Sequence, residues 1–179
     1  MNSIVLSVPI SREVLDFIID AVLKEDQDPM KLYKQVAERY GESVLDFDLL
    51  MTFLEKEGII EADIYGIKDG ESPRYYETYS RNRVSAANRQ EVVERLMIGN
   101  KILECERDET LFDMIITIIS GKKYSFKEIQ DEVMRRTGKQ VNWVVLATHL
   151  LELKRGGKVT KGFVEREGHN ATYYSALTV

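Results

Sequence analysis

The sequence contains one pattern of glycine and tyrosine residues twice, at a separation of about 98 residues. The matching positions are Gly41 with Gly138, Gly70 with Gly168, and Tyr75-Tyr76 with Tyr173-Tyr174, and Gly58 matches either Gly156 or Gly157. Self-similarity at a fixed period indicates that one structural unit is built twice, and this constrains the fold more than any single motif does. We therefore predict two copies of one small module.

The first copy reads as three helices followed by a β-hairpin. Ser11 is a predicted N-cap, and Asp28-Pro29 supplies the cap and first-turn proline of a second helix that stops at Gly41. The third helix carries apolar residues from Phe47 and ends at Gly58. The predicted strands lie within 60–67 and 75–79, and Asp69-Gly70 supplies a turn between them.

The second copy repeats this order with its own signals. Residues 111–119 have apolar residues at helical spacing, and Ser125 with Glu128 forms a predicted capping box for a helix that runs toward Gly138. A third helix with leucines at 146, 150 and 153 ends at Gly156-Gly157, and a hairpin with a turn at 167–168 follows. The sequence does not fix the register at the start of this third helix, around Val141 to Trp143, to better than two residues.

Residues 84–104 between the copies read as a linking helix, because they contain no proline and many apolar side chains. This helix can pack between the modules, serve as an extra core helix, or mediate a homodimer, and the sequence leaves these alternatives open. The predicted domains are an acidic module at 1–80, a linking helix at 81–106 and a second module at 107–179.

The charge is distributed unequally between the copies. Residues 1–80 contain 8 Lys/Arg and 17 Asp/Glu, whereas residues 105–179 contain 12 and 10. A hydrophobic content of 44% and a charged content of 31% are typical of soluble globular proteins. No apolar run approaches the roughly 20 residues of a membrane span, so we expect a cytoplasmic protein without a membrane partner. DNA would repel the first copy and attract the second.

Three helices and a hairpin are the elements of the winged-helix variant of helix-turn-helix. The stretches 53–60 and 70–76, and their counterparts at 150–159 and 168–174, resemble the third helix and wing of PadR-like and MarR-like transcriptional regulators. The resemblance implies a mainly α fold with small β-hairpin wings, as two tandem winged-helix modules joined by a helix. It also implies DNA binding with the third helix in the major groove and the wing on phosphates.

The second copy carries the polar side chains that this mode of DNA binding requires. Amide side chains at the start of its third helix can bond adenine, and basic side chains along the turn, helix end and wing can contact phosphates. The predicted DNA-binding residues are Lys127, Arg135, Arg136, Lys139, Gln140, Asn142, Lys154, Arg155, Lys158, Lys161, Arg166 and His169. Alternatively, the basic residues form a solvated face that neighbouring glutamates and aspartates balance.

The first copy has carboxylates at the equivalent place. Asp46 and Asp48 lie at the start of its third helix, where they favour the helix dipole and oppose the approach of phosphates. They are therefore either helix caps or part of a surface for a protein partner, and we do not expect this copy to bind a DNA groove unaided.

Signals for catalysis or metal binding are weak. His149, His169 and Cys105 do not have the spacing of a zinc site, and neither histidine has a nucleophile or carboxylate at a recognisable spacing. We expect His149 to lie at the surface or toward DNA, and Trp143 to lie in the core. The sequence thus predicts a non-enzymatic protein without a cofactor.

Two classes of function remain after this survey. The first is a transcriptional regulator that reads duplex DNA with its C-terminal module. The second is a protein-interaction adaptor, similar to the tandem winged-helix subunits of endosomal sorting complex II or the kleisin-associated subunits of bacterial condensins. The acidic total favours the adaptor. The basic residues of the second copy favour the regulator, and because they lie on the helix end and wing, where phosphate contacts are expected, DNA binding is the function we predict and the adaptor is the alternative.

Overall fold

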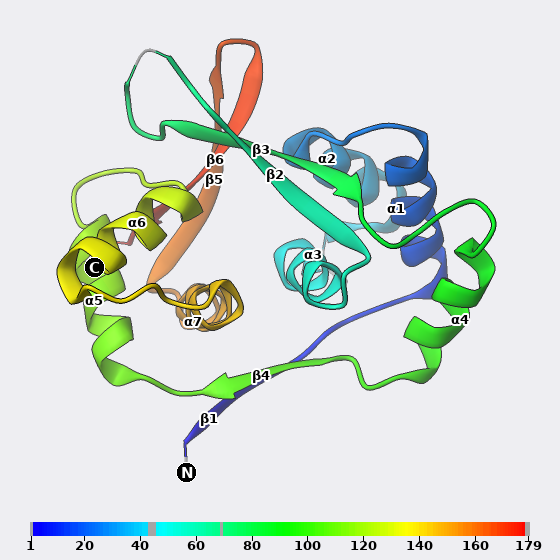
Figure 1. Cartoon of the computed structure of the whole chain (residues 1–179), viewed down its shortest axis with the longest axis horizontal. Helices are drawn as coiled ribbons and strands as arrows, with labels where there is room; N and C mark the ends of the chain where they lie inside the picture. The colour runs from blue at the N-terminus through cyan, green and yellow to red at the C-terminus, as the bar shows by residue number, and fades with distance from the viewer. Residues whose placement is uncertain (1, 43–45, 69, 178–179) are drawn as a thin grey trace. The chain divides into compact units, whose positions relative to one another are not determined.

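The fold was obtained as a computed structural model that describes residues 2–42, 46–68 and 70–177 (Figure 1). Within each copy, the helices and the two-stranded hairpin follow the order that the repeat predicts, so a mixed fold with small hairpins is confirmed. Asp69, which was predicted in the first hairpin turn, lies outside the described residues.

The first copy has the predicted three helices and hairpin. Its elements are α1 (Arg12–Lys24), α2 (Pro29–Tyr40), α3 (Phe47–Lys56), β2 (Ile60–Gly66) and β3 (Tyr75–Arg81). The predicted N-caps Ser11 and Asp28 accept hydrogen bonds from the backbone amides of Val14 and Lys31. These side chains satisfy amides that have no partner within the helix, which is why the helices begin there.

The second copy repeats these elements closely. They are α5 (Glu109–Ile119), α6 (Phe126–Thr137), α7 (Trp143–Arg155), β5 (Val159–Arg166) and β6 (His169–Ala176). The capping box of Ser125 and Glu128 is present, and Asn142 is the N-cap of α7, which resolves the open start of this helix. Strands β5 and β6 are antiparallel, and the two turn residues Glu167 and Gly168 both have positive φ, as a tight hairpin requires.

The segment between the copies differs from the predicted linking helix. Helix α4 covers only Arg89–Ile98, and β4 (Ile102–Glu106) pairs with β1 (Ser3–Ser7), a strand that the repeat did not predict. The helix stops because Gly99 leaves the helical conformation, with φ −71° and ψ 171°. Extended pairing with β1 then satisfies the backbone groups of β4 instead.

The chain divides into two compact units that are discontinuous in sequence. One unit contains Met1–Val5, Ile64–Glu77 and Glu104–Val179, and the other contains Leu6–Asp63 and Thr78–Leu103. The distal part of the first hairpin therefore belongs with the second copy, so the units do not follow the continuous ranges 1–80, 81–106 and 107–179. We call the first unit the C-terminal unit and the second the N-terminal unit.

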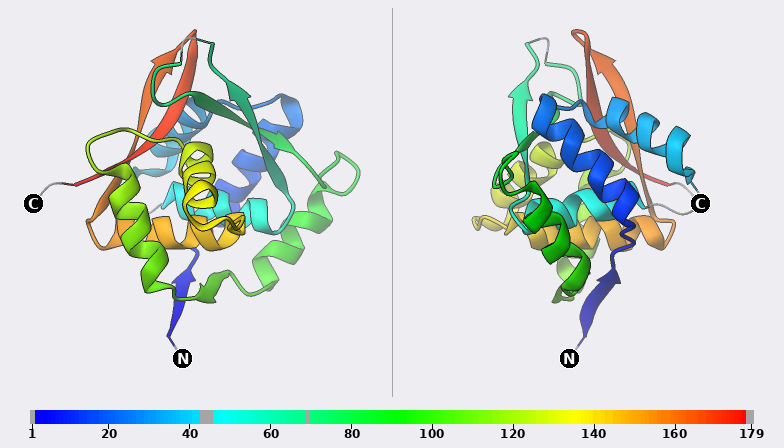
Figure 2. Two further views of the ribbon diagram at one scale, coloured as in Figure 1. Left: turned by 60° about the vertical axis from the view of Figure 1, so that its left-hand side comes forward. Right: turned by 90° about the vertical axis from the view of Figure 1, so that its right-hand side faces the viewer.

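Each unit has its own apolar core. Leu15, Ile18, Leu32, Leu50 and Leu54 are fully buried in the N-terminal unit. In the C-terminal unit, helix α5 packs on α6 and α7, and β6 packs on α5 and α6 (Figures 1 and 2). Its buried residues come from all of these elements and include Ile115, Ile119, Ile129, Leu146, Leu150 and Ala171. Apolar residues at helical spacing give each helix one apolar face, and these faces pack together to form the two cores, as the sequence predicts.

Candidate nucleic-acid interface

The N-terminus of α6 is bonded to the first hairpin. Glu128 is only 5% exposed, and its Oε1 accepts hydrogen bonds from the Ser125 amide (3.1 Å), the Ser125 hydroxyl (3.0 Å) and the Arg74 amide (3.1 Å). Arg74 Nε lies 3.4 Å from Glu128 Oε2, and the Ser72 hydroxyl donates to the carbonyl of Lys123. The capping carboxylate thus fixes residues of the first hairpin against the start of α6.

The second hairpin, β5-β6, also contacts the first hairpin, which lies beside it in Figure 1. Arg166 Nη1 lies 2.8 Å from a carboxylate oxygen of Glu71, and its Nη2 donates to the carbonyl of Ser72 at 3.1 Å. The His169 ring stacks on Tyr76 with a centroid distance of 4.0 Å and an interplanar angle of 4°. Two of the predicted DNA-binding residues, Arg166 and His169, therefore already contact side chains and backbone of the first hairpin.

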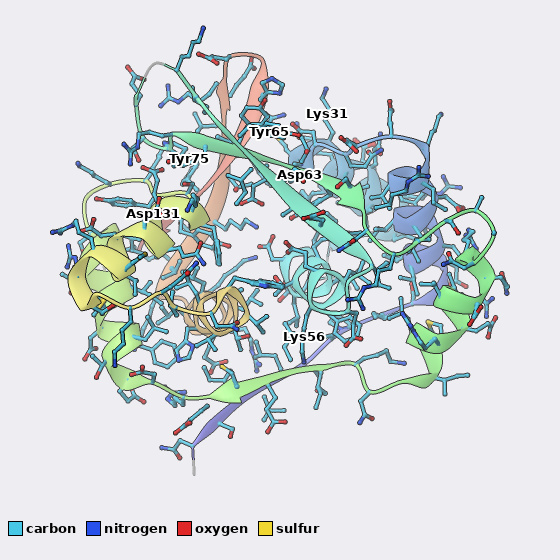
Figure 3. All side chains as sticks on the ribbon, in the orientation of Figure 1. Lys31, Lys56, Asp63, Tyr65, Tyr75 and Asp131 are labelled. Carbon is cyan, nitrogen blue, oxygen red and sulfur yellow. The ribbon has the colours of Figure 1, made fainter. Side chains whose placement is uncertain are left out.

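Besides His169, the Tyr76 ring stacks on a second ring, which belongs to the first hairpin itself. Tyr65 lies opposite on β2 (Figure 3), with a centroid distance of 5.1 Å and an interplanar angle of 20°. Such cross-strand aromatic pairs stabilise a hairpin. The aromatic contacts and the ion pairs together hold the distal part of the first hairpin, Ile64–Glu77, within the C-terminal unit.

The basic residues of α6 form ion pairs along their own helix. Lys127 Nζ lies 2.8 Å from Asp131, while Arg135 and Arg136 lie 2.5 Å and 3.0 Å from Glu132. Hydrogen bonds from Arg135 and then Arg136 lower the pKa of Glu132 to about 2. The charge that these cations would offer to phosphates is thus largely compensated, as the solvated-face alternative predicts.

This cluster gives a testable titration. We expect Glu132 to titrate near pH 2 in the folded protein, and Arg135→Gln to raise its pKa toward the ordinary value of about 4.3. Because the folded-state pKa is lowered, the pair contributes stability above the unfolded-state pKa and loses it as the pH falls toward about 2. Carboxyl chemical shifts measured by NMR would show this, and an unchanged Glu132 pKa in the variant would contradict it.

Helix α7 does not present base-reading side chains along its length. The positions that point away from its leucine stripe include Ala147, Thr148 and Leu151, which are 8%, 0% and 7% exposed. Asn142 uses its side-chain oxygen to accept a hydrogen bond from the Val144 amide at 2.8 Å. The predicted helix for the major groove is therefore buried in its central turns, from Leu146 to Leu151.

The remaining predicted DNA-binding residues lie near the two ends of α7. Gln140 and Lys139 precede the helix and Lys158 follows it, and all three side chains are exposed. Among residues 2–42, 46–68 and 70–177, neither lysine has a carboxylate within ion-pair distance. At the same helix end Arg155 lies 4.0 Å from Glu152, and on β5 Lys161 lies over the Tyr174 ring at 5.6 Å.

The expectation that His149 lies at the surface or toward DNA is wrong. The side chain is 0% exposed, its Nε2 accepts the Asp108 amide at 3.0 Å, and its Nδ1 lies 2.7 Å from the carbonyl of Val145. Because Nε2 must be the acceptor, Nδ1 carries the proton. Cys105 Sγ lies 3.8 Å from Nδ1, and burial raises the pKa of this thiol. A thiol with a raised pKa is a poor nucleophile, so this geometry gives Cys105 and His149 a structural role.

The acidic start of α3 supports helix formation. Asp46 is the N-cap and accepts a hydrogen bond from the Leu49 amide at 3.2 Å, and Asp48 lies in the first turn. Capping thus accounts for Asp46, as one of the two sequence interpretations expects, while the role of both residues in binding a partner stays a prediction.

The described residues contain neither a candidate membrane span nor a candidate metal site. No helix there combines the length and apolar character that crossing a membrane requires. Nor does that part of the chain bring together three or more histidine, cysteine, aspartate or glutamate side chains in a way that could hold a metal ion.

Comparison with known proteins gives little information on this chain. No protein-family model and no curated protein matches it. The chain is weakly similar to the crystal structure of Pex from Synechococcus sp. (strain PCC 7942), with 20% sequence identity and a TM-score of 0.33 over 50% of this chain and 85% of that chain. A TM-score of this size does not show that the two folds are related.

Proposed function

We propose that this protein is a non-enzymatic adaptor built from two tandem winged-helix modules, and that it assembles with a protein partner. The observation that carries this proposal is the position of the first hairpin. Residues 71–76 bond to the start of α6 and to the second wing, through Glu128 and Arg166. These are regions that a helix-turn-helix protein uses to hold the DNA backbone.

The character of α7 supports the same proposal. A recognition helix needs side chains that can bond base edges, and amides or guanidinium groups are the usual ones. The central turns of α7 offer Ala147, Thr148 and Leu151 instead, and these residues are buried. A helix whose central turns are buried on all sides packs against protein there and does not present these side chains to a DNA groove.

The charge of the folded units also favours a protein partner. The C-terminal unit contains 14 Lys/Arg and 14 Asp/Glu, because Ile64–Glu77 and Glu104 add acidic residues to the basic excess of the second copy. The N-terminal unit contains 11 Lys/Arg and 16 Asp/Glu. An acidic surface attracts basic partners and accelerates their association, so we expect the partner to be basic.

Co-purification with charge-neutral variants tests this proposal. We expect a stoichiometric, salt-sensitive partner from cells that express the protein, and we expect Asp46→Asn with Asp48→Asn to weaken its binding. Asparagine is as good an N-cap as aspartate, so the substitution at 46 removes charge without removing the cap. Glu61→Gln, at another exposed acid of the same unit, is the matched control. Equal binding by all three proteins would restrict Asp46 and Asp48 to capping, and recovery of the chain without a partner would contradict the adaptor.

One observation favours duplex DNA binding, by a transcriptional regulator, as a second candidate. Lys139, Gln140 and Lys158 are exposed near the two ends of α7, and neither lysine is paired with a carboxylate in the described part of the chain. These lysines can contact phosphates without displacing the first hairpin. If the protein binds duplexes, Lys139→Glu with Lys158→Glu will weaken binding and reduce its salt dependence.

A further inference from the structure

Strand β1 has one edge bonded to β4 and one open edge. The Arg107 amide donates to the carbonyl of Asn2, and the Val8 amide donates to the carbonyl of Lys101. In an antiparallel ladder these bonds assign the backbone groups of even-numbered β1 residues to β4. The amides and carbonyls of Ser3, Val5 and Ser7 therefore point to the other edge, where the described residues provide no strand.

The sequence of β1 is complementary to itself in an antiparallel arrangement. It reads Ser-Ile-Val-Leu-Ser, with Ile4 and Leu6 buried and the other three side chains exposed. In a pair centred on Val5, Ser3 lies opposite Ser7 of a second copy and Ile4 lies opposite Leu6. The same centre places each outward amide and carbonyl opposite its complement, so all three odd-numbered residues form hydrogen-bonded pairs.

Charge distinguishes the open edge of β1 from that of β4. β1 contains no charged residue, so two copies can meet without repulsion, and Val5 at the centre is 52% exposed. β4 carries the exposed carboxylates Glu104 and Glu106, and a similar pair centred on Glu104 would place the Glu104 carboxylates of the two copies opposite each other. Proteins protect strand edges that must stay unpaired with charged side chains, and β4 has this protection while β1 lacks it.

We propose that two copies of this chain associate through β1, in antiparallel register about Val5. The product is a four-stranded sheet in the order β4-β1-β1-β4, in which the open edges are the charged ones. This interface differs from the helix at 84–104 that the sequence suggested for a dimer. It also does not depend on whether the protein is an adaptor or a DNA-binding protein.

Sedimentation equilibrium of the full chain with charge variants at Val5 tests the interface. We expect the wild-type mass to rise with concentration toward twice the chain mass of 20.7 kDa. Val5→Lys and Val5→Glu place like charges opposite each other at the two-fold centre, so each protein alone should remain monomeric. A one-to-one mixture of these two variants should restore the dimer, because opposite charges then face each other across the strands.

Two control variants complete the experiment. Val5→Thr keeps an uncharged β-branched residue and should dimerise like the wild type. Ile98→Lys changes a large apolar residue at the end of α4 that is 84% exposed, and it should leave the β1 dimer intact. A wild-type monomer at all concentrations, a dimer that Val5→Lys does not weaken, or a mixture that stays monomeric would each overturn the proposal. Loss of the dimer in Ile98→Lys alone would assign the interface to the helix instead.

Discussion

Replacing Glu128 with alanine is expected to lower the free energy of unfolding by about 2 to 4 kcal/mol, because partly buried donors lose their acceptor. The amide and hydroxyl of Ser125 and the amide of Arg74 all donate to one carboxylate oxygen of Glu128. The substitution removes the capping box of α6 and the anchor of the first hairpin together. Urea unfolding would measure the change.

Glu165→Ala is the matched control for this substitution. Glu165 is an exposed glutamate on β5, and we expect its replacement to change stability by less than about 0.5 kcal/mol. Arg74→Ala should fall between the two, since it removes a side-chain ion pair and keeps the backbone amide. Equal stability of the Glu128→Ala and Glu165→Ala proteins would show that the first hairpin is not held as described.

Replacing His149 with leucine is expected to cost about 1 to 3 kcal/mol of unfolding free energy. Leucine fills most of the buried space but cannot accept the hydrogen bond of the Asp108 amide, which precedes α5. The substitution also removes the contact of the imidazole with the Phe112 ring, whose centroid lies 4.6 Å away. Thermal or urea unfolding would record the loss.

His169 provides the control, as the second of the two histidines. It is exposed and stacks on Tyr76, so His169→Leu should change stability by well under half of the His149 effect. A larger loss at His169 than at His149 would contradict the assignment of His149 as a buried structural residue.

Local signals were sufficient to predict most of the helices and both hairpins. Caps such as Ser11, Asp28 and Ser125 form the predicted bonds because capping depends on residues within one turn. The second hairpin turn was predictable for the same reason. These features require no knowledge of distant parts of the chain.

Long-range contacts were not predictable from the sequence. Arg74 and Glu128 are 54 residues apart, and no local sequence feature of either residue predicts that it bonds the other. The pairing of β1 with β4 likewise joins segments about 100 residues apart, and the apolar residues of β4 fit a helix as well as a strand. The sequence interpretation therefore counted the whole first hairpin with the first copy, whereas its distal part, Ile64–Glu77, belongs to the C-terminal unit.

Helix α7 carried a signal that the sequence interpretation did not use. From Trp143 to Leu151 the helix contains no charged residue, whereas an exposed recognition helix needs polar side chains on its outer face. This run predicts a buried helix, in agreement with the burial of Thr148 and His149. Attention to the basic residues at its ends favoured DNA binding instead.

Titration of a labelled generic duplex with the wild-type protein tests the central claim most directly. At about 50 mM salt, where phosphate contacts are strong, we predict no change in fluorescence anisotropy that depends on protein concentration. Saturable binding that weakens with salt, and that Lys139→Glu with Lys158→Glu abolishes, would contradict the adaptor and establish the protein as a duplex-binding one.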